Sequence, residues 1–337
     1  MSLINRNREA SLRYGGLTVH DATGKKVRAW MDVHEEKLLL RTDDRRVRYP
    51  LVIDPWVQLA KLTASDGALG DSFGAVSISG DTVVVGAPNA TVGTNQDQGA
   101  VYVFVKPASG WGNMTQTAKL TASDGAPFDE LGTSVAISGS TVIAGAPLAT
   151  IGSHSRQGAG YVFVMPADGW RGENEAAKLT ESDLGQYSQY FGSWIAISGE
   201  TVAIGIPLPS AGACVFVKPP GGWVSMTETA RLRASNGSNV EFGSAVGISG
   251  TVVVAGACLT DVGRHISQGS AYVFVRPRSG WRNMRETAEL TSSDGRSSKL
   301  KSRKPRLLCN FPNPPCNRAA CSRANLRCLR VSDHCLS

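Results

Sequence analysis

One pattern recurs along most of the chain. The segment AKLTASDG begins at Ala60 and again at Ala118, and the variants AKLTESDL, ARLRASNG and AELTSSDG begin at Ala177, Ala230 and Ala288. The spacings between successive starts are 58, 59, 53 and 58 residues. A repeat of this length is one supersecondary unit, which buries its apolar face only by stacking on its neighbours. The repeat therefore restricts the chain to architectures built from stacked copies.

Each copy contains the same four short segments. In the first copy they are GAVSIS (74–79), VVVGAP (83–88), VYVFVKP (101–107) and TAKLTAS (117–123). Short β-branched and aromatic runs separated by Gly, Pro, Asp and Ser are typical of strands, and no segment has a sustained helical period with caps. Four antiparallel strands in about 55 to 60 residues are the plan of a propeller blade. An extended β-solenoid is the alternative, although its repeats are usually shorter.

Two short motifs recur in register with these segments. The pair FG precedes the first strand at Phe73-Gly74, Phe191-Gly192 and Phe242-Gly243, with the variant Leu131-Gly132. The second strand ends in GAP at Gly86-Ala87-Pro88 and Gly145-Ala146-Pro147, and in GIP and GAC in the third and fourth copies. The pattern resembles the FG-GAP repeat, which forms the β-propeller of integrin α chains and of many secreted bacterial proteins.

These patterns predict an all-β fold, a truncated β-propeller of four complete four-stranded blades with a small N-terminal β domain. The predicted domains are a β module at 1–56 and a propeller at 57–295, with blades at 66–123, 124–182, 183–235 and 236–293. The segment 57–65 is expected to be a lone outer strand. In a closed ring such a strand completes the last blade, but the fourth copy already has its own outer strand. We therefore expect that a fifth or later blade is missing from this chain.

The basic charge is concentrated at the end of the chain. Residues 296–337 hold ten of the 35 Lys and Arg, one of the 28 Asp and Glu, and five of the seven Cys. The remaining residues, with 25 basic and 27 acidic side chains, are nearly neutral. We therefore expect no nucleic-acid partner. The tail begins in mid-motif and is predicted to be disordered or non-native. A basic arm and a zinc module are alternatives, although no CxxC pair occurs.

Sequence features bear on the location of the protein in two ways. No apolar run is long enough to span a bilayer. Residues 1–16 lack the hydrophobic core of a signal peptide, so either the protein is cytosolic or its true start has been lost. The resemblance to secreted repeat proteins implies an extracellular or cell-surface location.

Two kinds of local catalytic motif are missing from the sequence. It contains no phosphate-binding glycine loop, and HEEKL lacks the second His of a zincin helix. We therefore predict that the protein is not an enzyme. The alternatives are a fragment of a secreted propeller-bearing hydrolase or lyase, and a truncated gene product without function.

Calcium is the metal that the resemblance implies, in the loop between the first two strands of a blade. Here this loop is shortened to SGDTV, SGSTV, SGETV and SGTVV, with one carboxylate at most. Calcium takes six to eight oxygen ligands. The sequence therefore predicts no calcium and no other cofactor.

Blade topology brings two sets of loops to one face, and in integrin-like proteins this face contacts ligands. Loops between the fourth and first strands contain Asp71 and Asp129, for which a turn role is the alternative. The loops between the second and third strands supply the other ligand-binding candidates: Asn95, Gln98, His154, Arg156, Gln157, Arg264, His265 and Gln268. We predict a non-catalytic binding or adhesion module for a protein or carbohydrate ligand. Self-association through open blade edges is also expected.

Tryptophan recurs at the turn between the third and fourth strands. The four residues are Trp111, Trp170, Trp223 and Trp281. They could stack on sugars, but packing across the blade edge is favoured.

Overall fold

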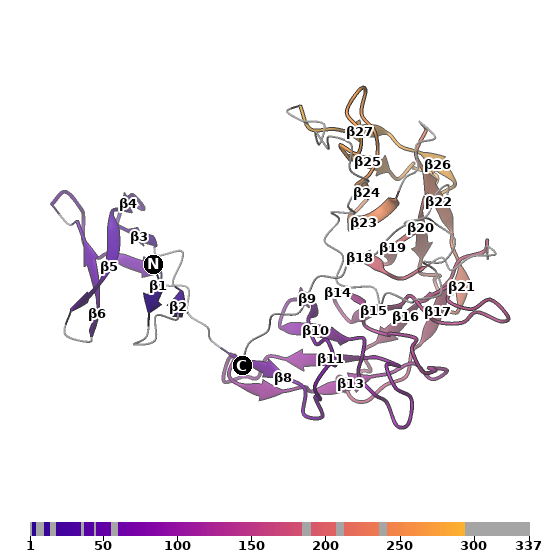
Figure 1. The fold of residues 1–337 in the computed structure, drawn as a ribbon, viewed down its shortest axis with the longest axis horizontal. Helices are drawn as coiled ribbons and strands as arrows, with labels where there is room; N and C mark the ends of the chain where they lie inside the picture. The colour runs from indigo at the N-terminus through magenta and orange to yellow at the C-terminus, as the bar shows by residue number, and fades with distance from the viewer. Residues whose placement is uncertain are drawn as a thin grey trace, which may run out of the picture. The chain divides into compact units, whose positions relative to one another are not determined.

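The structure, a computed structural model, describes residues 2–4, 10–13, 18–34, 37–43, 45–54, 60–183, 190–206, 212–235 and 241–293. Regular structure in these ranges is entirely β, with 27 strands and no helix (Figure 1). The predicted all-β fold is confirmed. The chain forms two compact units, residues 1–149 with 161–177 and residues 150–160 with 178–337. The predicted basic tail lies outside the described residues.

The N-terminal module consists of short strands. They are β1 (Ser2–Ile4), β2 (Ala10–Arg13), β3 (Thr18–His20), β4 (Lys26–Val27), β5 (Ala29–His34), β6 (Lys37–Thr42) and β7 (Val52–Asp54). Strands β1 and β2 pair, as do β5 and β6, while β3 lies between β4 and β7. Val19 and Val27 are buried, and Asp21 accepts hydrogen bonds from Thr23 and Lys25 in the turn between β3 and β4. The turn has the sequence DATGKK.

The first repeat forms one antiparallel sheet. Its strands are β9 (Ala75–Ser79), β10 (Thr82–Ala87), β11 (Ala100–Val105) and β13 (Ala118–Leu120), in the order β13-β11-β10-β9. Residues on β10 are in register with both neighbours, since Val84 lies opposite Ser77 and Val103. Val84 and Val103 are fully buried, as expected for a central strand between stacked sheets.

Three further sheets follow the same plan. The second contains β14 (Ser134–Ser138), β15 (Thr141–Ala146), β16 (Ala159–Val164) and β17 (Ala177–Thr180). The third contains β18 (Trp194–Ser198), β19 (Thr201–Ile206), β20 (Gly212–Val217) and β22 (Ala230–Arg233). The fourth contains β23 (Phe242–Ser249), β24 (Val252–Ala257), β25 (Ser270–Val275) and β27 (Ala288–Leu290). Each sheet is built as the sequence predicted for a propeller blade.

The two glycines of the recurring motifs meet between successive sheets. A Cβ atom on Gly86 would lie 1.9 Å from the carbonyl oxygen of Gly132, and Gly132 has a φ of 93°. Gly205 and Gly243 repeat this contact, with a Cβ atom 2.0 Å from the carbonyl oxygen. Only glycine allows backbones to approach so closely. The FG glycine of one sheet thus packs on the GAP glycine of the sheet before it.

A short parallel strand joins three of the outer strands to the next repeat. Strand β12 (Met114–Thr115) pairs with β8 (Leu62–Thr63), β21 (Met226–Thr227) with β17, and β26 (Met284–Arg285) with β22. These segments follow the tryptophan turn between the third and fourth strands, where no strand was predicted. Strand β8 belongs to the predicted lone outer strand, whose residues 57–59 lie outside the described residues. It occupies against β12 the place that β17 occupies against β21.

A recurring polar contact, which we call the serine clip, accompanies these junctions. The backbone N–H of a serine after the outer strand donates to a Glu or Gln of the next repeat at 2.9 Å, in the pairs Ser65–Gln116, Ser123–Glu175, Ser182–Glu228 and Ser235–Glu286. In the three Glu pairs the serine hydroxyl donates to the second carboxylate oxygen. The clip satisfies backbone and side-chain groups together, and it recurs at every junction between described repeats.

Candidate functional site

The loops between the second and third strands share one backbone conformation in three of the repeats. Each contains a two-residue turn closed by a single bridge, at Val92–Asn95, Ile151–His154 and Val262–His265. Each also has a left-handed residue two positions after the bridge, Asp97, Arg156 or Ser267, with φ of 52°, 57° and 52°. The third repeat has a short connection between β19 and β20 instead, whose residues 207–211 lie outside the described part.

The recurring glutamine supports this loop. Gln98 is buried, and its side-chain Nε2 donates to the carbonyl oxygen of Ala122 at 3.4 Å. Gln268 makes the equivalent bond to Ser292 at 2.9 Å. Gln157, in the corresponding position of the second repeat, is also buried. Gln98 and Gln268 therefore tie their loops to the end of the outer strand of their own sheets, and ligand contact by the three glutamines stays a prediction.

The remaining loop candidates differ in exposure. Asn95 donates to Gln98 Oε1 at 2.9 Å and to the carbonyl oxygen of Gly125 at 3.0 Å, so it belongs to the loop support. His154 and Arg156 are partly exposed, and Arg264 and His265 are exposed. The last four residues are the ones that present side chains at the loop tips.

Asp71 and Asp129 are engaged in turns. The carboxylate of Asp71 accepts the backbone N–H of Ala68 at 2.7 Å, and that of Asp129 accepts the N–H of Ala126 at 2.9 Å. Asp129 is only 7% exposed. This is the turn role that the sequence left open as the alternative, and ligand contact by these two residues stays a prediction.

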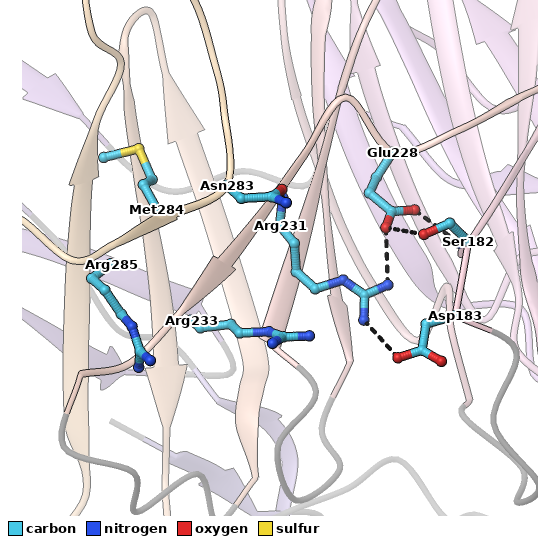
Figure 2. A pocket seen from close by; sticks show the side chains of 8 residues that line it. All are labelled: Ser182, Asp183, Glu228, Arg231, Arg233, Asn283, Met284 and Arg285. Atoms are coloured by element: carbon cyan, nitrogen blue, oxygen red, sulfur yellow. Dashed lines mark hydrogen bonds and ion pairs between the residues drawn. The ribbon is translucent and has the colours of Figure 1, made fainter.

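A cavity that the sequence analysis did not predict lies among the outer strands of the second unit (Figure 2). It has a volume of about 480 Å³ and is lined by Ser182, Asp183, Glu228, Arg231, Arg233, Asn283, Met284 and Arg285. In Figure 2, Arg231 and Arg233 extend side by side toward Asp183. Arg233 is exposed and makes no hydrogen bond or ion pair with the described residues, whereas Arg285 donates to the carbonyl oxygen of Ala234.

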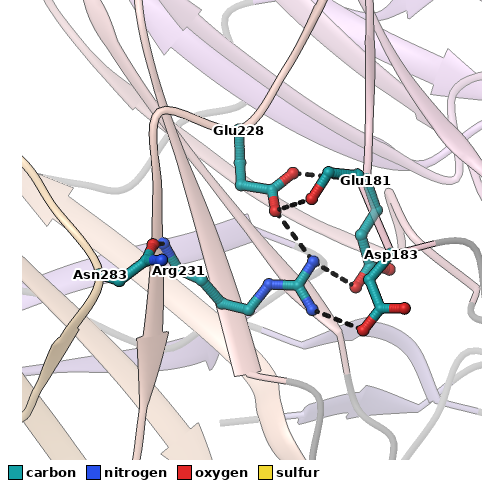
Figure 3. A network of polar contacts seen from close by, with 6 residues as sticks. Glu181, Asp183, Glu228, Arg231 and Asn283 are labelled. Carbon is teal, nitrogen blue, oxygen red and sulfur yellow. Dashed lines mark hydrogen bonds and ion pairs between the residues drawn. The ribbon is translucent and has the colours of Figure 1, made fainter.

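Arg231 is the centre of a buried network (Figure 3). Its Nη2 lies 2.9 Å from Glu181 Oε1 and 2.9 Å from Glu228 Oε1, and its Nη1 lies 3.5 Å from Asp183 Oδ2. Glu228 is also the acceptor of the serine clip from Ser182. The guanidinium N–H groups of Arg231 that face these three carboxylates are therefore all paired within the protein.

Burial governs the ionisation of this network. It raises the pKa of Glu181 to about 7, with Arg231 opposing and Glu228 and Asp183 adding to the rise. Burial alone would raise the pKa of Glu228 too, but hydrogen bonds from Ser182 and Arg231 lower it below its usual value. Glu228 therefore stays ionised at neutral pH, whereas the pKa of Glu181 lies close to neutral pH.

The origin of the network can be read from a comparison of repeats. Tyr102 and Tyr161 donate to Asp66 and Asp124 at 2.9 and 3.0 Å, but the third repeat has the buried Cys214 in their place. Glu181 stands where three other copies have Ala and the last has Ser292, and burial, together with Glu228 and Glu181, raises the pKa of the Cys214 thiol. The Glu181–Arg231 pair thus occurs in the repeat that lacks the tyrosine. Glu181 for Ala and Cys214 for Tyr were the available sequence signals.

The shortened first loop does not suit calcium. Its single carboxylate is paired with a lysine in two repeats, Asp81 with Lys106 at 3.1 Å and Glu200 with Lys218 at 2.8 Å. A bound cation would have to displace the lysine and still lack most of its oxygen ligands. No group of three or more His, Cys, Asp or Glu suited to a metal is found where the structure is described.

The tryptophans pack between sheets. Trp170, Trp223 and Trp281 are 6%, 8% and 7% exposed, and Trp281 lies in one core cluster with Leu232 and Phe274. Trp111 packs against the cluster that contains Tyr102. The preference for packing over sugar stacking is confirmed.

Together, these features define a class of protein. Repeated four-stranded antiparallel sheets, with glycine contacts and serine clips between them, are propeller-type blades. The model of the FG-GAP repeat matches residues 56–104, 114–163 and 226–274, so the chain is an FG-GAP repeat protein. No curated protein matches the chain.

Several solved structures are similar to this chain, and one of them is a designed protein. The crystal structure of the computationally designed Ika4 protein is 14% identical, with a TM-score of 0.35, over 64% of this chain and 96% of that chain. A likeness at this level carries no argument. Within the described residues there is no helix with the length and apolar character needed to cross a membrane.

Proposed function

We propose that this chain is a non-catalytic, extracellular or cell-surface binding module that holds a protein or carbohydrate ligand with its loop tips. FG-GAP repeats imply a propeller-type binding or adhesion module at the coarse level. The proposal adds the ligand class, the location and the residues. The side chains at its centre are His154, Arg156, Arg264 and His265.

One observation carries the proposal. Three loops have the same bridge and the same left-handed conformation, and two of them carry exposed or partly exposed His and Arg side chains at their tips: His154 and Arg156 in the second repeat, Arg264 and His265 in the fourth. A fixed backbone that carries exposed side chains is how rigid scaffolds present binding residues. The buried glutamines supply the rigidity.

The chemistry of the cavity supports binding rather than catalysis. A general acid and base pair needs two carboxyl groups that reach a substrate. Here Glu181 is buried against Arg231, and Glu228 is held by Ser182 as well as by Arg231. No carboxyl group of this pair is left to act on a substrate.

Paired loop variants test the proposal. The full chain would be screened on a glycan microarray and against a panel of purified extracellular matrix proteins. For any ligand found, H154A/R156A and R264A/H265A are expected to weaken binding by about tenfold or more, since truncated interface hot spots cost roughly 1–3 kcal/mol. The control is R278A/R282A, two exposed arginines beside Trp281, outside the loops.

The outcomes separate clearly. Loss of binding in the loop variants with an intact control supports the proposal. Binding that survives both loop variants, or that is lost only in the control, would overturn it. Turnover of a bound glycan or protein, detected by mass spectrometry, would overturn its non-catalytic part.

A further inference from the structure

The outward face of the first sheet is an incomplete interface. Val76 and Ile78 on β9 are 67% and 65% exposed. The equivalent residues on β14, Val135 and Ile137, are only 9% and 6% exposed. These four positions have the same sequence context, so the first sheet presents an apolar surface of the kind that is covered in the second.

The outward face of the fourth sheet is the complementary half. Val254 on β24 and Val273 on β25 are half-buried. Their equivalents in the first sheet, Val84 and Val103, are fully buried. The fourth sheet thus leaves open the face by which the first sheet packs on its successor.

Polar groups on the two faces match as well. Between successive repeats, Ser79 Oγ accepts the backbone N–H of Gly139 at 3.1 Å, and Ser198 Oγ accepts that of Gly250 at 3.1 Å. The equivalent serine on the open face of the fourth sheet is Ser249, and the equivalent glycine on the first sheet is Gly80. Both residues are exposed.

The outer-strand position decides how the two faces could join. Strand β27, exposed along its length, pairs with β25 and places Glu289 opposite Tyr272. In the first sheet this position holds Lys119, whose Nζ lies 5.5 Å from the centre of the Tyr102 ring. The segment 60–62, which leads into β8, has Lys61 at the position of Glu289. Ala60 and Leu62 correspond to Ala288 and Leu290.

Strand β8 is also held firmly by its own repeat. The backbone N–H of Lys61 donates to Asn113 Oδ1 at 2.7 Å, and Ser65 is clipped by Gln116. Strand β8 can therefore keep these bonds while it presents its free edge to another sheet. Strand β27 has no such clip among the described residues.

We propose that copies of this chain associate head to tail, with the first sheet of one copy packed on the fourth sheet of another. Strand β8 of the first copy replaces β27 beside β25 of the second. The contact reproduces the interface between successive repeats: apolar faces meet, Ser249 reaches Gly80, and Lys61 lies over Tyr272. The partner is thus a second copy of this chain.

Light scattering of the full chain, under reducing conditions and at physiological salt, tests this directly. We expect the mass to rise above that of one chain over about a hundredfold range of concentration, as mass action requires. Variants I78D and V254D each place a charge on one face and are expected to weaken association about tenfold or more. V224D, which alters an exposed valine in the turn of the third repeat, is the control.

Mixing the two variants makes the test specific. A mixture of I78D and V254D retains one intact pair of faces, so it should form a complex of two chains and grow no further. Complementation would occur even if each variant were slightly destabilised, and circular dichroism checks that each is folded. A wild-type chain that stays monomeric, or variants that associate as well as wild type, would overturn the proposal.

A third variant tests the strand exchange. E289K restores a lysine opposite Tyr272 within β27, which should then compete better with β8. We expect self-association to weaken about two- to fivefold, the range of a partly exposed cation–π contact. Association that is unchanged or strengthened by E289K would exclude the exchange of β27.

Discussion

At the scale of single residues, Glu181 stands out. It occupies a position where three other repeats have alanine, and Arg231 lies beside it. Its Oε2 atom is buried with no hydrogen-bond partner among the described residues. A buried carboxylate oxygen in this state favours the protonated form of the group. Glu181 therefore makes stability depend on pH.

The sign of this dependence follows from the raised pKa. Since the pKa of Glu181 is about 7 in the folded chain against 4.5 ordinarily, its contribution is fully present below pH 4.5 and is lost as pH rises through 7. We expect wild type to lose melting temperature relative to E181Q between pH 5 and pH 8. Scanning calorimetry of both chains at several pH values measures the difference. A constant difference across this range would contradict the assignment.

The buried tryptophans allow a second prediction. The Nε1 atoms of Trp170, Trp223 and Trp281 have no hydrogen-bond partner among the described residues. Trp281→Ala should cost about 3–5 kcal/mol because it opens a cavity. Trp281→Phe should cost less than half as much, since it removes an unsatisfied donor that costs about 1–3 kcal/mol. Urea unfolding measures both, and equal costs would show that the N–H is satisfied.

At the scale of elements, the serine clip is the link between repeats. Each clip joins residues about 50 apart in sequence and orders the end of an outer strand. It acts beside the short parallel strands, which alone supply only two paired residues each. The clips therefore supply hydrogen bonds between successive sheets in addition to those of the parallel strands.

Removing one clip should have a measurable cost. Glu175→Ala deletes the bonds from the N–H and hydroxyl of Ser123, at 2.9 and 2.6 Å, and should lower the free energy of unfolding by about 1–2 kcal/mol. Glu200→Ala, the control, deletes an exposed ion pair with Lys218 that is worth roughly 0–1 kcal/mol. Urea midpoints at constant slope compare them. Equal shifts would argue against a structural role for the clip.

At the scale of the whole molecule, stability is expected to be independent of calcium. The carboxylates in the shortened loops are neutralised by lysines, as in the Asp81–Lys106 and Glu200–Lys218 pairs. The full chain should therefore show the same melting temperature in excess calcium and in excess chelator. A rise of several degrees with calcium would reveal a site outside these loops.

The sequence predicted the sheets well for a local reason. Strand periodicity, turn residues and the FG and GAP motifs act within one repeat, and they identified the four strands of each sheet and the packing of the tryptophans. The register of β10 with β9 follows from the short turn at residues 80–81, whereas β11 pairs with β10 across the longer loop 88–99. The turn role of Asp71 and Asp129 was among the alternatives that the sequence left open, whereas the bonds of Gln98 and Gln268 to backbone carbonyls were not foreseen.

By itself, then, the sequence determined the all-β fold, the repeat and the likeness to FG-GAP proteins, because each rests on local pattern. Only the tertiary structure decided the parallel strands, the serine clips and the cavity around Arg231. These join outer strands to residues of the next repeat about 50 positions later, and no local pattern records which polar groups meet there. The pairing of Glu181 with Arg231 joins the residue after β17 to β22 and becomes visible only in the tertiary structure.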